Sequence, residues 1–399
     1  MTDRIVYSPA STSAISNGDH ERKEVWDFAR AGTAARVPED SPLIDEDDGG
    51  IEHVDRADRS MHARIVESGV EVAETDTASI EEIRALHSIP PNESPRAGDP
   101  PMVVVVDTGL DPTHPVFADT TVRCEDFTGD GPQDGFGHGT AVAGQIARIA
   151  PEATIVSLRV LSANGSGSMS DILSAYEWIY QHANEIDVVN MSLGFPDKVP
   201  TIDRIHNEMI AQGVRDTVAA GNTGGPGGSP ATATRAFSMG ACNVDGDLAS
   251  FSSYDSGYDN PDVTAVGANC RMAQAENTTM GRDLDGPFVA ANGTSFAAPI
   301  GAGVIARYLN RGIDPTQSIP RTFEEHADDV ADTPRDGAGV LDYTGVIDDA
   351  TTTTAHVYSL LNQNNDSIYL ESNWLPAGQL RAELIDADSP GTTITFVER

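Results

Sequence analysis

The chain has 399 residues, 39% of them apolar, which is enough for one large domain with additional segments. Asp and Glu number 62 against 25 Lys and Arg, so the formal net charge is −37. A surface this acidic repels nucleic acids and anionic membranes, and no apolar run reaches the length of a membrane span. These properties argue against a nucleic-acid-binding protein and against a membrane protein.

The basic residues are nearly all arginine, because the only lysines are Lys23 and Lys198. An excess of carboxylates with so little lysine is typical of proteins from salt-saturated cytoplasm, where counterions screen self-repulsion. The acidic residues are spread along the chain, which disfavours an interaction tail. We expect a halophile-type acidic protein, whose oligomeric state the sequence leaves open.

The three cysteines, Cys124, Cys242 and Cys270, are far apart and form no CxxC motif. They exclude a disulfide framework, although a single bridge stays open. The first residues, "MTDRIVYSPASTSAISNGD", contain no apolar segment of the kind found in export signals and no twin arginine. The expected location is therefore the cytoplasm.

The N-terminal part divides into two segments. Residues 1–50 are polar and acidic, which predicts a poorly ordered extension with one helix near 22–30. Residues 51–100 show partial alternation and then a short helical pattern, for which Thr77 or Ser79 is the expected N-cap. We expect this second segment to be propeptide-like or regulatory.

A proline-rich linker at 90–101 leads into the large domain, residues 101–350, where short apolar runs alternate with helical patterns. This alternation predicts βα units and a parallel sheet that is covered on both faces. The predicted strands are 102–106, 154–160, 186–191, 216–220 and 236–240. The predicted helices are 138–149, 170–183, 202–212 and 295–310. Residues 351–399, rich in Thr and turn residues, predict a small C-terminal β-rich appendage.

Asp107 follows four valines in "VVVVDTG", so it stands at the end of a strand that is buried on both faces. Asp-Thr-Gly fits two protease chemistries: two carboxylates that share a water molecule, or one carboxylate that orients a histidine next to a serine. The first needs a second aspartate at a strand end. Asp255 in "YDSGYD" is the candidate, but the preceding "ASFSSY" is not an apolar strand, so a carboxylate pair is disfavoured.

Three further residues have the chemistry of the second alternative. His138 in "GFGHGTAVAG" begins a helical pattern between two glycines, which let the backbone pass close to a neighbour. Ser295 in "NGTSFAAPIGAG" begins another helix, with Pro299 expected in its first turn, and its own N–H would face an oxyanion. Asn222 in "AAGN" ends an apolar strand, where its amide could donate to the same oxyanion. Each residue alone also has an ordinary structural explanation, as a surface histidine, an N-cap or a turn residue.

In chain order, the stretches "VVVVDTG", "GHGTAVAG", "AAGN" and "NGTSFAAP" resemble the motifs of the subtilisin-like serine proteases, the subtilase family. The resemblance covers roughly residues 100–350. It implies a doubly wound α/β fold with a mostly parallel sheet sandwiched by helices. It also implies a catalytic triad of Asp107, His138 and Ser295, with the Ser295 N–H and the Asn222 amide as the oxyanion hole. Ser295 would then attack a peptide carbonyl and form an acyl-enzyme.

The resemblance further implies two segments between which an extended peptide lies as an added strand, and a pocket for the side chain before the scissile bond. Small residues in the pocket wall predict room for a large apolar side chain. The expected substrate-binding residues are Gly165, Ser166, Gly167, Ser192, Leu193, Gly194, Ala219, Ala220 and Gly221. The expected function is therefore a serine endopeptidase with polypeptide substrates. A catalytically silent adaptor that binds peptides is the alternative, although no triad residue is replaced.

Some family features differ in this chain. Ala141 and Ile300 stand where members often have histidine, but neither position belongs to the triad. The stretch "RIAPEATIVSL" is short and lacks the Asn and Asp residues of the family's strong calcium loop. No required cofactor and no metal site is therefore expected, while weaker calcium binding stays open. Secreted members carry a propeptide; residues 51–90 are the candidate here, with the linker as the scissile region and a permanent regulatory segment as the alternative.

Overall fold

The computed structural model describes residues 3–8, 23–28, 32–44, 53–56, 60–62, 77–91, 100–255, 260–313, 323–328 and 335–345. The appendage predicted at 351–399 lies outside these residues. The four-part division of the chain therefore stays a prediction at its C-terminal end.

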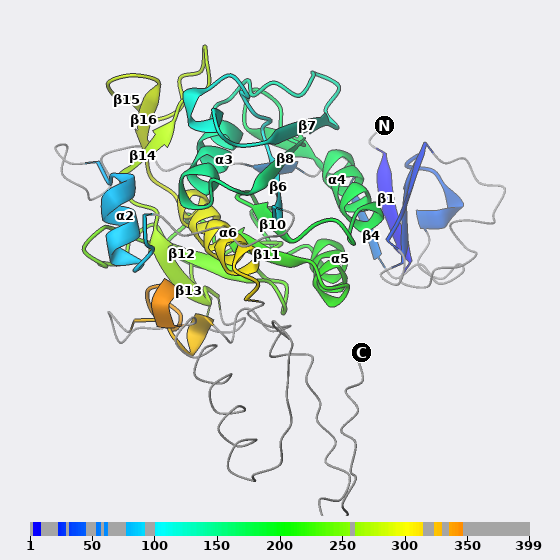
Figure 1. The fold of residues 1–399 in the computed structure, drawn as a ribbon. Coiled ribbons are helices and arrows are strands. Elements are labelled where there is room, and N and C mark those ends of the chain that lie inside the picture. Colours follow the sequence, from blue (N-terminus) through cyan, green and yellow to red (C-terminus); the bar gives the residue numbers. More distant parts are fainter. Residues whose placement is uncertain are drawn as a thin grey trace, which may run out of the picture.

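A seven-stranded sheet, in which every pair of neighbours is parallel, forms the centre of the large domain (Figure 1). Its strands are β6 (Met102–Asp107), β7 (Val122–Asp126), β8 (Thr154–Arg159), β10 (Val188–Met191), β11 (Arg215–Ala219), β12 (Ser238–Cys242) and β13 (Val263–Val266). The order is β13-β12-β11-β10-β6-β8-β7, so the chain builds one side of β6 and then crosses to the other. The carboxyl ends of strands beside such a reversal form the crevice in which doubly wound folds bind ligands.

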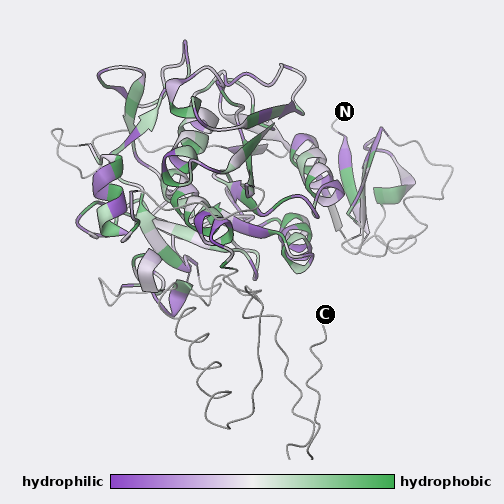
Figure 2. Cartoon of the chain, in the orientation of Figure 1, coloured by the Kyte–Doolittle hydropathy of each residue, from purple (hydrophilic) through white to green (hydrophobic). Residues whose placement is uncertain are grey.

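Helices cover both faces of this sheet. They are α3 (His138–Ile149), α4 (Met169–Gln181), α5 (Pro200–Ala211) and α6 (Thr294–Asn310). Val103 and Val105 are buried in the core formed with α3 and α6, whereas Val104 and Val106 are buried in the core formed with α4 and α5. Successive strand residues face opposite layers, and this explains four consecutive valines. In Figure 2, α4 and α5 carry both apolar and polar residues, as helices with one buried face do. The predicted doubly wound α/β fold, with a parallel sheet between helices, is confirmed.

The predicted strands and helices of the large domain all exist, with ends shifted by at most two residues. Several short strands were not predicted. These are β7, β9 (Ser166–Ser168), β13 and the antiparallel strands β14 (Cys270–Ala273), β15 (Arg282–Asp283) and β16 (Phe288–Ala291).

The N-terminal part contains a four-stranded antiparallel sheet of order β2-β3-β1-β4, which lies beside α4 and α5 (Figure 1). Its strands are β1 (Arg4–Ser8), β2 (Glu24–Asp27), β3 (Thr33–Val37) and β4 (His53–Arg56). The prediction of a poorly ordered segment with a helix near 22–30 is therefore wrong for these residues. Trp26 of β2 is buried, and its indole N–H donates to the Ser174 hydroxyl of α4 at 3.0 Å. Partners this distant in sequence leave no trace in local periodicity.

Residues 77–91 pack on the large domain. Ser79 is the N-cap of α2 (Ile80–Leu86), where it forms a capping box with Glu82. Ile83 of α2 is buried in the same core as α3 and α6. Ala78 pairs with Cys270, the first residue of β14: its N–H donates to the Asn269 oxygen, and its own oxygen accepts from the Arg271 N–H. This part of the predicted 51–100 segment is therefore structurally part of the large domain.

Candidate active site

Asp107 and His138 form a buried pair at the carboxyl edge of the sheet. Asp107 is the last residue of β6, and His138 is the first residue of α3. The His138 Nδ1 lies 2.8 Å and 2.9 Å from the two carboxylate oxygens of Asp107, and both side chains are fully buried. Because a carboxylate only accepts hydrogen bonds, Nδ1 carries the proton and the ring is held in one orientation. Asp107 thus faces a histidine and not a second carboxylate.

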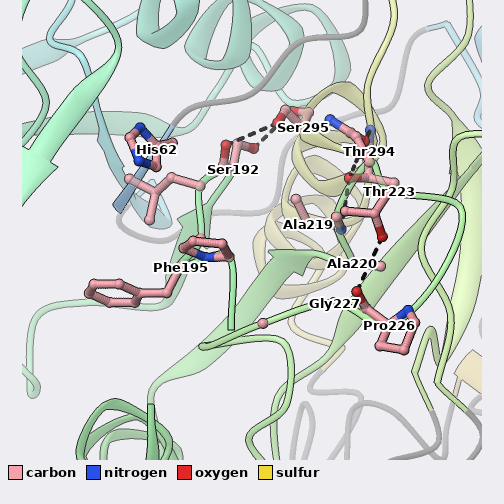
Figure 3. Close-up of a pocket in the computed structure, with 16 residues that line it drawn as sticks. His62, Ser192, Phe195, Ala219, Ala220, Thr223, Pro226, Gly227, Thr294 and Ser295 are labelled. Atoms are coloured by element: carbon pink, nitrogen blue, oxygen red, sulfur yellow. Dashed lines mark hydrogen bonds between the residues drawn. The ribbon is translucent and has the colours of Figure 1, made fainter. Parts of the chain in front are cut away.

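Ser295, the second residue of α6, is bonded to Ser192, which directly follows β10. The Ser295 hydroxyl donates to the Ser192 carbonyl oxygen at 3.0 Å, and the Ser192 hydroxyl donates to the Ser295 carbonyl oxygen at 2.8 Å (Figure 3). Pro299 lies inside α6, beyond its first turn, so the sequence-based placement of this proline is wrong. Since proline has no N–H, it leaves the carbonyl four residues earlier, that of Ser295, without its helical donor. The Ser192 hydroxyl donates to this carbonyl instead.

The hydroxyl of Ser295 is therefore directed at Ser192 and not at His138. The Nε2 atom of His138 is buried and has no hydrogen-bond partner among the residues that the structure describes. The ring of Phe296, the residue after Ser295, has its centroid 5.6 Å from that of His138, so the start of α6 lies beside the imidazole. The structure brings the three predicted residues to one place but shows only the Asp–His hydrogen bond.

Asn222 lies after β11 and is oriented by the first residue of α6. Its Oδ1 accepts from the N–H and from the hydroxyl of Thr294, both at 2.9 Å. The Thr294 hydroxyl also accepts from the Gly221 N–H at 3.1 Å. With its oxygen bonded to Thr294, the Asn222 amide has its NH₂ group on the side away from that residue.

A pocket opens beside Ser295 (Figure 3). Six of the nine expected substrate residues line it, namely Ser192, Leu193, Gly194, Ala219, Ala220 and Gly221. Phe195, Pro196 and Pro226 add apolar surface that the sequence did not point to, and no Asp, Glu, Lys or Arg is among the lining residues. A Cβ on Gly228, also in the lining, would lie 2.1 Å from the Phe195 carbonyl oxygen. The wall therefore packs too closely for any other residue there.

The other three expected residues, Gly165, Ser166 and Gly167, lie at β9, across from that pocket wall. A short strand of the N-terminal part, β5 (Ser60–His62), pairs with β9 in antiparallel register, with Met61 opposite Gly167. On its other side the His62 N–H donates to the Gly194 oxygen at 3.1 Å, and the Gly194 N–H donates to the His62 oxygen at 3.2 Å. A piece of this same chain thus lies as an added strand between the two segments expected to hold a peptide. The strand β5 has only three residues, and its partners in β9 lie about a hundred positions later in the chain, so it was not detectable from sequence.

Within the described ranges, no three or more His, Cys, Asp or Glu side chains are grouped so that they could hold a metal ion. In that same part of the chain, no helix combines the length and apolar character needed to cross a bilayer. Weak calcium binding stays a prediction.

Comparison with known proteins shows which family and which proteins this chain is similar to. A model described as the subtilase family matches residues 98–334. M-protease of Shouchella clausii (strain KSM-K16) is 37% identical over 217 residues, which cover 51% of this chain and 52% of that protein. Subtilisin NAT of Bacillus subtilis subsp. natto is 30% identical over 341 residues, or 77% of this chain and 85% of that one.

Among solved structures, a cold adapted subtilisin-like serine proteinase is similar with a TM-score of 0.51 and 28% identity, covering 64% of this chain and 95% of that chain. The match to M-protease spans about half of that relative's length. The family match nevertheless covers more than half of the chain and agrees with the parallel sheet and with the buried Asp–His pair. The chain belongs to the subtilase family of subtilisin-type serine endopeptidases.

Proposed function

We propose that the chain hydrolyses peptide bonds with Asp107, His138 and Ser295 as its catalytic triad. The observation that carries this proposal is the buried Asp107–His138 pair beside the start of α6. With the proton held on Nδ1 by Asp107, Nε2 is the basic nitrogen of the ring. The mechanism requires the Ser295 side chain to rotate away from the Ser192 carbonyl, so that its hydroxyl can donate to Nε2.

The reaction then follows acyl-transfer chemistry. Ser295 Oγ attacks the substrate carbonyl while its proton passes to His138, and the oxyanion accepts hydrogen bonds from the Ser295 N–H and the Asn222 amide. His138 gives the proton to the leaving amine. Water then attacks the acyl-enzyme and passes a proton to His138, which returns it to Ser295 Oγ as the acid product leaves. The hydrogen bonds from Thr294 to the Asn222 oxygen support this role, because they orient the amide before substrate arrives.

The substrate is proposed to be an extended peptide with a large apolar residue before the scissile bond. The pocket beside Ser295, which has Phe195, Pro196 and Pro226 but no Asp, Glu, Lys or Arg in its lining, supports this preference. The strand β5 supports the binding mode, because it already uses the backbone of Gly167 and Gly194 as an added peptide strand would. No cofactor enters any step.

We also infer that the N-terminal part regulates the enzyme by occupying its cleft. While Ser60–His62 pairs with β9 and with Gly194, a substrate cannot use the same backbone groups. Ala78, Ile83 and Ile89 are buried in the core of the large domain. A cut between positions 62 and 77 would release β5 and leave α2 in place, which favours that interval over the proline-rich linker as the scissile region.

One experiment tests function and processing together. Wild type and Ser295→Ala are purified in parallel, treated with a fluorophosphonate probe and analysed by intact mass and N-terminal sequencing. Labelling at Ser295, together with an N-terminal cut found only in wild type, is the expected result. Folded wild-type protein that takes up no probe would support the alternative of a silent peptide-binding adaptor. Labelling without any cut would support a permanent regulatory segment.

The cellular setting is a proposal that rests on composition alone. We propose a cytoplasmic protein that works in concentrated salt, since 62 acidic residues face 25 basic ones. Measuring which cell fraction contains the protein tests the location.

A further inference from the structure

Asp134 is a buried carboxylate for which the proposed mechanism has no role. It is 2% exposed, and its two oxygens accept five hydrogen bonds. The Oδ1 atom accepts from the Thr108 hydroxyl at 2.9 Å and from the N–H groups of Phe136 and Gly137 at 3.0 Å and 2.7 Å. The Oδ2 atom accepts from the N–H and the hydroxyl of Thr140 at 2.9 Å and 2.7 Å. So many donors on one carboxylate indicate a fixed structural junction.

These donors come from both sides of the Asp–His pair. Thr108 directly follows Asp107 at the end of β6. Thr140 lies in the first turn of α3, which begins at His138. The Thr108 hydroxyl also accepts from the Gly139 N–H at 2.9 Å, and the Thr108 N–H donates to an Asp107 oxygen at 2.7 Å. One carboxylate therefore connects the strand end that carries the acid with the helix start that carries the base.

The same carboxylate also supplies the missing cap of α3. The N-cap residue is Gly137, which has no side chain to cap the helix. It has a φ of +103°, and a Cβ there would lie 2.7 Å from the Thr278 hydroxyl oxygen, so a Ser, Asp or Asn cap does not fit. Asp134 accepts from the N–H groups of Gly137 and Thr140 instead. The cap of this helix is thus provided from a residue that is also tied to β6.

We propose that Asp134 is a positioning residue for the proposed serine-protease reaction: it holds the end of β6 and the start of α3 in register, and so keeps the Asp107 carboxylate on the His138 Nδ1. The inference rests on the proposed function. All five contacts donate to Asp134, as an ionised carboxylate requires. Burial raises the pKa of Asp134, and the hydrogen bonds from Gly137 and Thr140 act in the opposite direction.

The test replaces Asp134 with Asn, which keeps the shape but sets an NH₂ group against donors. When catalytic side chains are displaced by about 1 Å, the rate of the catalysed reaction can fall on the order of 100-fold. We expect kcat to fall by about 10- to 100-fold with KM within about twofold. The acid limb of the pH profile of kcat/KM should move to lower pH, because the imidazolium loses support from Asp107.

Two substitutions at Thr108 test the same inference if Asp134→Asn does not fold. Both leave the Asp134 carboxylate unchanged. Thr108→Val removes the hydroxyl that connects Asp134 to the Gly139 N–H, whereas Thr108→Ser retains it. We expect Thr108→Val to lower kcat and to move the acid limb in the same direction, and Thr108→Ser to restore both.

Asp126→Asn is the matched control. Asp126 also organises a loop, but its donors are the Thr128 N–H and hydroxyl and the Gly131 N–H. Wild-type kinetics are expected for it. An active wild type with an Asp134→Asn variant whose kcat and pH profile are unchanged would overturn the inference alone, whatever the loss in melting temperature. A folded wild type without peptidase activity or probe labelling would overturn the function and the inference together.

Discussion

Ser192 and Ser295 exchange two hydrogen bonds, in which each hydroxyl donates to the other residue's carbonyl oxygen. One of the two uses an acceptor that Pro299 leaves available, because a proline at this position gives the Ser295 carbonyl no helical donor. The Asn190 side-chain amide donates to the Ser192 hydroxyl oxygen at 2.9 Å, so this hydroxyl is held from two sides. The end of β10, which lies next to the pocket, is thereby fixed to the residue proposed as the nucleophile.

This relationship predicts a non-additive pair of substitutions. Ser192→Ala removes the donor to a buried carbonyl and should lower the free energy of unfolding by about 1–3 kcal/mol. In a Pro299→Ala background the new Ala N–H can donate to the same carbonyl, so the loss from Ser192→Ala should be smaller; what remains reflects the buried Asn190 amide, which also donates to the Ser192 hydroxyl. Urea unfolding of the four proteins measures the coupling. Equal losses in both backgrounds would show that Pro299 does not control this contact.

Replacing Asp107 with Asn should abolish most turnover while the fold persists. The amide can present its NH₂ group to His138 and hold the proton on Nε2, which is the wrong tautomer for a base. Losses of about 10⁴ in kcat are typical of this change in serine proteases. Steady-state kinetics on a peptide ester measure it, with circular dichroism as the control for folding. Activity within tenfold of wild type would remove Asp107 from the triad.

The proposed oxyanion hole makes a separate prediction. Asn222→Ala should lower kcat by about 10²–10³ with little change in KM, because the amide acts on charge that develops after binding. Thr294→Val removes one of the two donors that orient the Asn222 oxygen and should have a smaller effect in the same direction. Thr294→Ser retains the hydroxyl and is the control. An Asn222→Ala variant that changes only KM would place this residue in substrate binding instead.

The sequence predicted the large domain well because its signals are local. Four consecutive valines ending at Asp107 mark a strand covered on both faces, and β6 has this environment. Glycines around His138 and before Ser295 mark helix starts, and α3 and α6 begin there. Asp107, His138 and Ser295 were expected at one site because their motifs resemble those of the subtilases; each of them ends a strand or lies at the start of a helix.

The remaining features depend on contacts that local patterns do not encode. Trp26 lies in a strand that pairs with β3, and its indole N–H donates to Ser174 of α4, although its neighbourhood suggested a helix. The strand at Met61 exists through pairing with Gly167. The direction of the Ser295 hydroxyl depends on Ser192, and no motif specifies a rotamer.

His87 predicts a pH-dependent stability. It is fully buried; its Nδ1 lies 2.8 Å from the Leu341 oxygen, and its Nε2 accepts from the Val266 N–H at 3.1 Å, which requires a neutral ring. Burial lowers the pKa of His87 from 6.5 to about 4. The unfolded chain therefore binds this proton at higher pH than the folded one. The stabilisation is complete above pH 6.5 and is lost as the pH falls toward 4, by up to about 3 kcal/mol.

Other groups titrate in this range, so the His87 contribution is obtained by comparison. Urea unfolding at pH 7 and pH 4.5 is measured for wild type and for His87→Gln. The variant should be less stable at pH 7 and should lose about 2 kcal/mol less than wild type on acidification. Parallel losses in the two proteins would show that His87 is already protonated in the folded state or exposed to solvent.

The net charge of −37 predicts that the protein needs salt. Repulsion among the carboxylates reaches about 10 Å at 0.1 M ionic strength but only about 3 Å at 1 M, so the folded state should gain stability as KCl is added. We expect a melting temperature that rises from low salt to multimolar KCl, and inactivation when salt is removed. Sucrose at matched water activity is the control, because it favours compact states without screening charge. A protein that keeps its activity and its melting temperature in salt-free buffer, or that responds to sucrose as strongly as to KCl, would show that charge repulsion does not limit this fold.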